Sequence, residues 1–307
     1  MNTKRHGHIV LFGGTGFLGQ RLRRFFAGGG YEVVVISRGG EGRRRWDGKT
    51  QGAWAGYLEG AAAAINLAGK HVNCRYTRAA LAEIDESRTD SVAAVGEAIR
   101  RCASPPPVWV QAGSLAIYGD AGEAWCDESH PAGKGIPPRT CLKWEAAFAE
   151  EAVPQTRKVM LRIGFVLGRD GGALGTLEKR VRAYLGGAAG SGRQYISWLH
   201  PDDFCRIVQH AIDTPAAGIY NACAPEPVTN AEFMRLLRAQ LGKPWSPPVP
   251  GILARIGAFF MRTEAVLALT GRRGAPKRLW DDGFRFEYSD CAEALAAIYA
   301  EPPPNDE

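Results

Sequence analysis

Short apolar runs recur along the first two thirds of the chain, and segments with helical periodicity separate them. Five of these runs are rich in Val, Ile, Leu and Ala: residues 9–12, 32–36, 62–67, 108–111 and 157–163. Short runs of mostly apolar residues are typical of strands that are buried on both faces of a parallel sheet. Helical patterns lie between them at residues 17–26, 81–99 and 139–147. This alternation predicts an α/β fold.

A glycine-rich turn joins the first run to the first helix in the sequence HIVLFGGTGFLG at residues 8–19. We expect Gly13 to allow a tight turn, Gly16 to let the backbone approach a phosphate, and Gly19 to let the helix pack on the strand. A plain structural turn is the alternative, but a strand, a turn and a helix N-terminus in this order favour a dinucleotide site in a Rossmann-type, doubly wound parallel sheet. The predicted cofactor contacts here are Gly13, Thr15, Gly16, Phe17, Leu18 and Gly19.

The end of the second run predicts which cofactor is bound. An NAD enzyme usually has an acidic residue at this strand tip, but here the tip carries Ser37 and Arg38. A guanidinium favours the 2′-phosphate of NADP, whereas a carboxylate would repel it. We therefore predict NADP as the cofactor, bound partly by Ser37 and Arg38. The arginines at 43–45 are interpreted as a solvated loop.

Composition narrows the class of protein. The 307 residues are 45% hydrophobic and 23% charged, with a formal charge of +6 that suits any anionic partner. No apolar run reaches the length of a membrane helix, and the first residues lack the apolar core of a signal peptide. Seven cysteines without a C-x-x-C pair argue against a disulfide framework or a zinc knuckle. We expect a cytoplasmic protein that binds a small-molecule substrate but no metal, membrane or nucleic acid.

Several motifs further along resemble those of one enzyme family. The tip Leu67-Ala68-Gly69 follows the third run, and Ser114 lies four residues before the pair Tyr118-Gly119. With the glycine turn, these motifs are similar to extended short-chain dehydrogenase/reductases of the epimerase/dehydratase group. The resemblance implies that Ser114 polarises a substrate carbonyl. It also implies that the cofactor lies along Leu67, Ala68, Gly69, Gly113 and Gly164.

One expected motif is missing. The family's Y-x-x-x-K pair, a tyrosine acid/base with a supporting lysine, is absent from residues 131–151. If Lys143 is the family lysine, the tyrosine position holds Arg139; if Glu145 marks the register, the lysine position holds Cys141. Three interpretations stay open: Tyr118 acts as the proton donor with support from Lys143 or an arginine, another acid from the substrate lobe acts, or the protein binds NADP(H) without efficient catalysis.

The second half of the chain extends the resemblance to nearly the whole sequence. Its S-W-x-H segment, W-E helix and R-x-x-P-x-x-L tail resemble an atypical, sugar-nucleotide-epimerase-like branch with a small C-terminal domain. We predict a Rossmann domain at residues 1–220, with a substrate-lobe insertion around 168–200, and a C-terminal substrate lobe at 221–307. The predicted substrate contacts are Arg75, Gln194, Trp198 and His200, although a structural histidine is the simpler interpretation of His200.

These observations predict an NADP-dependent epimerase or oxidoreductase that acts on a hydroxyl or keto carbon of a small substrate, a nucleotide sugar being one candidate. The alternative is an NADP(H)-binding regulatory or interaction protein. The resemblance also implies a homodimer.

Overall fold

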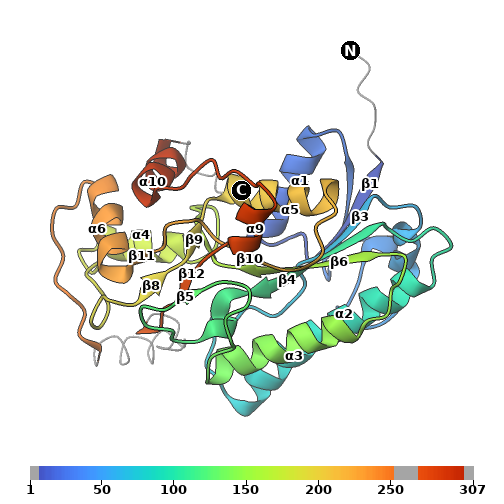
Figure 1. Cartoon of the computed structure of the whole chain (residues 1–307), viewed down its shortest axis with the longest axis horizontal. Coiled ribbons are helices and arrows are strands. Elements are labelled where there is room, and N and C mark those ends of the chain that lie inside the picture. The colour runs from blue at the N-terminus through green and yellow to red at the C-terminus, as the bar shows by residue number, and fades with distance from the viewer. Residues whose placement is uncertain (1–6, 252–268, 301–307) are drawn as a thin grey trace.

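Six parallel strands form the central sheet (Figure 1). The structure is a computed structural model, and it describes residues 7–251 and 269–300. The strand order is β10-β6-β4-β3-β1-β2, and every pairing is parallel. The strands are β1 (His8–Phe12), β2 (Glu32–Ile36), β3 (Ala63–Asn66), β4 (Val108–Ser114), β6 (Arg157–Ile163) and β10 (Gly218–Ala222). The predicted doubly wound parallel sheet is confirmed.

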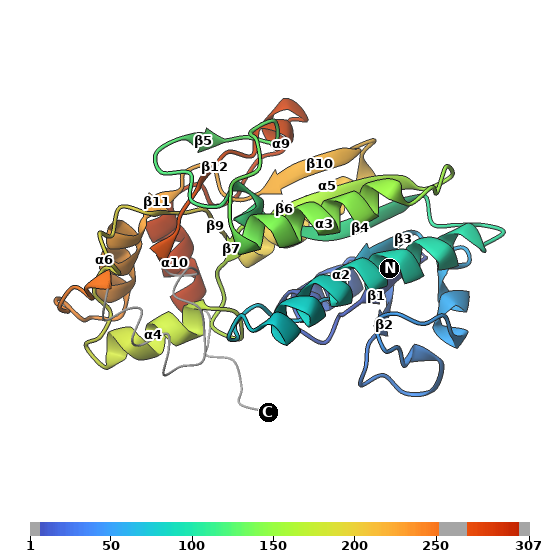
Figure 2. The same cartoon turned by 90° about the horizontal axis from the view of Figure 1, so that it is seen from below.

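Helices cover both faces of the sheet (Figures 1 and 2). The helices are α1 (Phe17–Gly28) and α5 (Pro201–Asp213) on one face, and α2 (Arg78–Arg100) and α3 (Ile136–Glu150) on the other. Alternate residues of β1 divide between the two layers, because Ile9 and Leu11 belong to the core under α1 and α5, while Val10 and Phe12 belong to the core under α2 and α3. Burial on both faces explains why the run is apolar without interruption. Among the described residues, no helix is long and apolar enough to cross a bilayer.

The topology places a crevice at one end of the sheet. Strand β1 lies between β2 and β3, so the chain crosses to the other side of β1 after β2. Ligands of open α/β sheets bind at such a switch point, beyond the carboxyl ends of the strands. The glycine turn after β1 and the tip after β3 both lie at this end.

A smaller lobe is built from short elements of the second half (Figure 1). It contains β7 (Phe165–Val166), α4 (Leu174–Arg182), β8 (Tyr195–Ile196), β9 (Trp198–Leu199), β11 (Val228–Thr229), α6 (Asn230–Gln240) and α10 (Cys291–Ala300). Its own apolar core joins Phe233 and Leu237 of α6 to Leu295 of α10 and Val181 of α4. The lobe is therefore a second packing unit.

The chain returns to the sheet after leaving the lobe. The strand β12 (Arg273–Gly274) pairs with β5 (Trp125–Cys126), and the short helix α9 (Lys277–Asp281) packs on β10. The Tyr220 hydroxyl of β10 donates a hydrogen bond to the Asp282 carboxylate at 2.7 Å. This hydrogen bond holds the segment after α9 against the sheet. Parts of residues 221–307 thus cover the Rossmann sheet, and the boundary at residue 220 stays a prediction. Residues 252–268 and 301–307 of the predicted lobe lie outside the described residues.

Candidate cofactor and active site

Two positions of the glycine turn, Gly13 and Gly19, leave no room for a side chain. Gly13 has a φ of +72°, and its N–H donates to the carbonyl of Ile36 at 2.9 Å. A Cβ on Gly13 would lie 2.9 Å from the backbone nitrogen of Ala68, and one on Gly19 would lie 2.4 Å from Cα of Gly14. The turn, the tip of β3 and the first turn of α1 are therefore held backbone to backbone. Gly19 packs on the turn itself rather than on the strand, which corrects the predicted role.

The N-terminus of α1 is open toward the crevice. Gly16 is the N-cap residue, is exposed, and supplies no side chain to cap the helix. A Cβ on Gly16 would have only the Gly13 carbonyl oxygen within 4.0 Å, and the preceding Thr15 is also exposed. Uncapped N–H groups at a helix start, with space in front of them, suit the pyrophosphate of a dinucleotide. The residues fit the predicted cofactor.

Phe17 packs under a neighbouring loop. A Cβ on Gly168 would lie 2.2 Å from Cζ of Phe17, and one on Gly171 would lie 2.5 Å from Cβ of Phe17. The Arg21 guanidinium donates twice to the carboxylate of Asp170, at 3.0 and 3.1 Å. The half-buried Phe17 ring thus holds the loop after β7 against α1, so its side chain is not a free cofactor contact. Leu18 is half-buried and packs against the core under α1 and α5.

The tip of β2 presents Arg38 to solvent. Ser37 is buried, its N–H donates to the Arg44 carbonyl at 3.2 Å, and its carbonyl accepts from the Trp46 N–H at 3.0 Å. Arg38 follows directly and is exposed at the carboxyl end of β2, beside the glycine turn. These two backbone hydrogen bonds of Ser37 fix the position of the neighbouring Arg38 backbone. This is the position expected of a 2′-phosphate contact.

A buried amide network shapes the tip of β3. Asn66 is fully buried; its Nδ2 donates to Gln111 Oε1 at 2.9 Å, and its Oδ1 accepts from the Ala68 N–H at 3.0 Å. The half-buried Leu67 and Ala68 and the exposed Gly69 follow at the crevice. Sequence reasoning missed Asn66 and Gln111, although a polar residue at the end of each apolar run was the available signal.

Ser114 ends β4 at the same edge of the sheet. It is half-buried, and its Oγ accepts a hydrogen bond from the Ala116 N–H at 3.2 Å. This contact uses a lone pair and leaves the hydroxyl proton free to be donated. Gly113 and Gly164 allow close packing at this end of the sheet. A Cβ on Gly113 would lie 2.7 Å from Met160 Sδ, and one on Gly164 would lie 2.4 Å from the Ser197 carbonyl oxygen.

Tyr118 is a structural residue in the described network. It ends the 3-10 helix Leu115–Tyr118 (η3), is 2% exposed, and its hydroxyl oxygen lies 2.7 Å from the Asp127 carbonyl and 2.8 Å from Asn221 Oδ1. Arg162 Nη1 donates to the same oxygen at 2.8 Å. Burial raises the pKa of Tyr118 to about 12, despite Arg162 nearby. The geometry argues against the predicted role of proton donor, because no side of the hydroxyl is left for a substrate.

The structure distinguishes the two registers on α3. Glu145 binds Arg162 of β6 through two hydrogen bonds of 2.8 Å, and Cys141, one turn earlier on the same face, packs against η3. Lys143 lies two residues from each, so it faces outward and pairs with Asp85 of α2 at 2.5 Å. The Cys141–Glu145 register is the one that faces the sheet. The outward position of Lys143 argues against its predicted role as a support for the proton donor.

The predicted substrate contacts separate into buried and accessible residues. Trp198 is fully buried and donates to the Glu226 carbonyl at 2.8 Å. His200 is 2% exposed, its Nδ1 accepts from the Asp202 N–H at 3.2 Å as the N-cap of α5, and burial lowers its pKa to about 4. The burial of both side chains argues against their predicted contact with substrate. Gln194 is half-buried and donates to the Ala189 carbonyl at 2.9 Å, and Arg75 is exposed.

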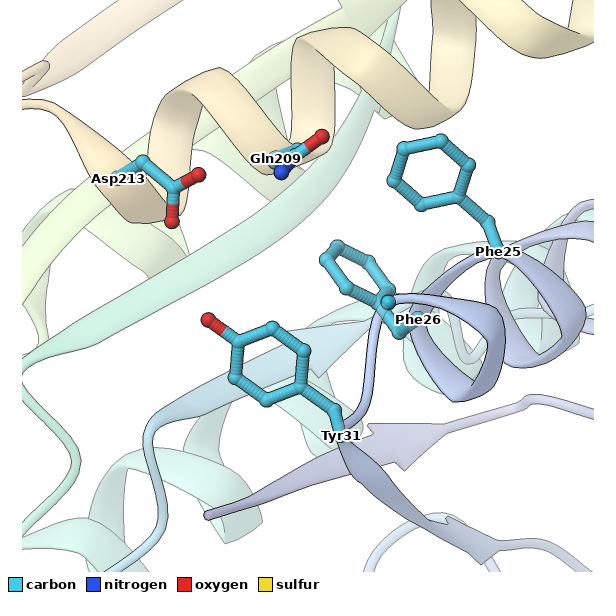
Figure 3. A pocket seen from close by; sticks show the side chains of 6 residues that line it. Phe25, Phe26, Tyr31, Gln209 and Asp213 are labelled. Atoms are coloured by element: carbon cyan, nitrogen blue, oxygen red, sulfur yellow. The ribbon is translucent and has the colours of Figure 1, made fainter. Parts of the chain in front are cut away.

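A separate hollow lies at the other end of the sheet (Figure 3). Its lining comes from the C-terminal ends of α1 and α5 and the start of β2: Phe25, Phe26, Gly29, Tyr31, Gln209 and Asp213. These positions are at the amino end of the strands, opposite the glycine turn, so the hollow is not part of the cofactor crevice. Within the described ranges, no group of three or more His, Cys, Asp or Glu side chains could hold a metal ion.

Comparison with known proteins identifies the family. Residues 9–223 match the model of the NAD dependent epimerase/dehydratase family, and residues 249–298 match a domain of unknown function (DUF1731). The epimerase family protein SDR39U1 of Bos taurus is 36% identical over 299 residues, which cover 95% of this chain and 99% of the relative.

Two solved structures extend the match to three dimensions. The crystal structure of the human epimerase family protein SDR39U1 (isoform 2) with NADPH has a TM-score of 0.85 and 31% identity, covering 96% of this chain and 100% of that chain. The nucleoside-diphosphate sugar epimerase from Corynebacterium glutamicum has a TM-score of 0.78 and 26% identity, covering 97% of this chain and 59% of that chain. The protein belongs to the NAD dependent epimerase/dehydratase family.

Proposed function

We propose that the protein is an NADP-dependent oxidoreductase or epimerase that acts on a hydroxyl or keto carbon of a small substrate. The observation that carries the proposal is the juxtaposition of an uncapped helix start at Gly16, the exposed Arg38 and the free hydroxyl proton of Ser114 at one edge of the sheet. NADPH in the human relative supports the choice of cofactor. When bound, the cofactor supplies or accepts a hydride.

Ser114 is proposed to polarise the substrate carbonyl. Its hydroxyl donates to the carbonyl oxygen, where negative charge develops as the carbon is reduced. The Ala116 N–H that binds Oγ orients this donor. Because Tyr118 is enclosed and Lys143 faces outward, we propose that the proton for the alkoxide comes from a group other than these two side chains.

Replacing Arg38 with aspartate tests the cofactor. The wild-type protein is expected to bind NADPH more tightly than NADH, and Arg38→Asp is expected to weaken NADPH binding by roughly 10- to 100-fold, the size of a lost charge-assisted contact. Fluorescence titration of both cofactors measures this. Arg23→Asp, at an exposed position of α1, is the matched control. Equal binding of both cofactors, unchanged in the Arg38 variant, would overturn the assignment.

Replacing Ser114 with alanine tests the chemistry. Loss of the donor is expected to lower kcat by roughly 100- to 1000-fold while the Kd for NADPH is unchanged. NADPH oxidation is followed with a panel of small ketones and keto-sugars, with the exposed Ser191→Ala as control. Turnover that survives in Ser114→Ala would remove this residue from the mechanism.

A second candidate function is an NADP(H)-binding regulatory or interaction protein. The enclosed Tyr118 hydroxyl, with the missing Y-x-x-x-K pair, favours it. Tight NADPH binding without turnover of any panel member would support this reading. A homodimer and a cytoplasmic location stay predictions.

A further inference from the structure

A loop of the small lobe reaches across to the first helix of the Rossmann sheet. Leu167 and Leu174 are fully buried in the apolar core of the lobe, so they fix both ends of the segment between them. This segment, the strap (residues 168–173), leaves the core, lies against α1 and returns. The strap therefore connects the lobe to the helix whose N-terminus is the proposed pyrophosphate site.

Two consecutive residues of the strap bind to opposite sides. Arg169 binds to the lobe: its Nε lies 3.6 Å from Glu178 Oε2 of α4, and its guanidinium lies 4.8 Å from the ring centre of Tyr299 of α10. The Asp170 carboxylate accepts two hydrogen bonds from Arg21 of α1, at 3.0 and 3.1 Å. All four charged side chains are at most 20% exposed, so neither pair is an ordinary surface ion pair.

One face of α1 receives the strap. Phe17, Arg21 and Arg24 follow one another at intervals of four and three residues, so they lie on the same side of the helix. The Phe17 ring packs under two glycines of the strap, and Arg24 Nη1 lies 3.9 Å from the Asp170 carboxylate. One carboxylate thus faces two guanidinium groups. The excess of positive charge near the start of α1 favours an anionic cofactor.

The strap lies beside the proposed pyrophosphate site. Phe17 directly follows the N-cap residue Gly16, and a Cβ on Gly171 of the strap would lie 2.5 Å from Cβ of Phe17. The strap thus contacts the helix turn whose N–H groups face the crevice. We propose that the strap retains bound NADPH, and that the ion pair of Arg21 and Asp170 is the latch that holds it in place. Both are positioning residues, because they act on the cofactor through the strap.

The physical basis of retention is the exclusion of water, and it rests on the proposed position of the cofactor. A strap held against the first turn of α1 limits the access of water to this turn. Hydrogen bonds from its N–H groups to the pyrophosphate are then stronger than they would be in open solvent. The latch slows release to the extent that the cofactor binds the closed strap more tightly than the open one. NADPH and NADH share the pyrophosphate, so the strap retains either, whereas Arg38 discriminates between them.

Replacing Asp170 with asparagine tests the latch. The amide keeps the shape of the side chain but removes the charge that binds both arginines. Stopped-flow displacement by excess NADP+ measures the release of NADPH, and we expect the rate to rise by roughly 10-fold, the size of a lost charge-assisted contact. The Kd of NADH should rise by the same factor, so that the preference between the two cofactors is unchanged.

Reversing both charges distinguishes a latch from general damage to the fold. Arg21→Asp alone brings two carboxylates together, and it should release NADPH at least as fast as Asp170→Asn does. The double variant Arg21→Asp with Asp170→Arg restores an ion pair between α1 and the strap, and it should recover much of the slow release. Arg21→Lys, which keeps the charge, should retain part of it.

Asp281→Asn is the matched control. It makes the same change in an exposed pair with Lys277 on α9, which packs on the edge strand β10, and the release rate should stay at the wild-type value. An unchanged rate in Asp170→Asn, no recovery in the double variant, or an effect confined to NADPH would each overturn the latch.

Failure of the proposed function has a different signature. If Ser114→Ala leaves turnover unchanged while Asp170→Asn still speeds release, the proposed chemistry fails and the latch stands. If the wild-type protein binds no NADPH, both are overturned.

Discussion

Replacing Glu145 with alanine is expected to lower the free energy of unfolding by about 3–5 kcal/mol, because it leaves Arg162 as a buried cation without its partner. The Arg162 and Glu145 side chains are 8% and 13% exposed, and two hydrogen bonds of 2.8 Å join them. Burial opposes the charge on Arg162, yet Glu145 outweighs it and raises the pKa of the guanidinium. Tyr118 and, through it, Asn221 depend on the same arginine.

Urea unfolding followed by far-UV circular dichroism measures this change. Lys143→Ala is the matched control on the same helix: its pair with Asp85 is solvent-exposed on the lysine side, so the expected loss is within about 1 kcal/mol. The double variant Arg162→Met with Glu145→Met should regain much of the stability, since it removes both charges together. If Glu145→Ala costs no more than Lys143→Ala, the buried pair does not stabilise the junction of α3 and β6.

The fold could be predicted from the sequence, but the roles of the candidate catalytic residues could not, because these roles depend on contacts between distant parts of the chain. The inner sheet strands are buried on both faces, so an apolar run such as residues 9–12 marks its strand without tertiary information. The glycine turn is also marked locally by its spacing, and Gly19 packs on Gly14 five residues earlier, although Gly13 is constrained by Ala68 at the tip of β3. Local physics was sufficient for both.

The roles of Tyr118, Lys143 and His200 depend on contacts that are distant in sequence. The Tyr118 hydroxyl is enclosed by Asn221, 103 residues away, and Lys143 is turned outward by Asp85, 58 residues away. A helix position alone does not say which face meets the sheet when both candidate registers carry plausible residues. In this structure, the bidentate pair of Glu145 and Arg162 shows that the face of α3 with Cys141 and Glu145 meets the sheet.

The small strands β5 and β12 were not predicted for a related reason. Each has two residues, and Trp125 of β5 is 47% exposed, so neither shows a buried apolar run. Their pairing joins residues about 150 positions apart. Asn221 connects them to the sheet, because its Nδ2 donates to the Cys126 and Ala275 carbonyls at 3.0 and 2.9 Å.

Replacing Gly19 with alanine is expected to weaken NADPH binding by roughly 100-fold or more. The new Cβ would lie 2.4 Å from Cα and 2.6 Å from the carbonyl carbon of Gly14, and backbone atoms cannot rotate away as a side chain does. The turn and the start of α1 must separate, and a misplacement of about 1 Å in a positioned site can cost about 100-fold. Fluorescence titration with NADPH measures the loss.

Gly28→Ala, on the same helix, is the matched control for Gly19→Ala. A Cβ at Gly28 would have no atom within 4 Å, and the residue is exposed at the C-terminal end of α1. This variant should bind NADPH as the wild type does and gain up to about 1 kcal/mol in stability, because alanine favours the helix. If Gly19→Ala unfolds at the wild-type temperature and still binds NADPH normally, the pyrophosphate does not lie at the N-terminus of α1. A selective loss of binding in Gly19→Ala would instead tie the cofactor to the glycine turn, where the backbone of Gly14 leaves no room for a side chain at Gly19.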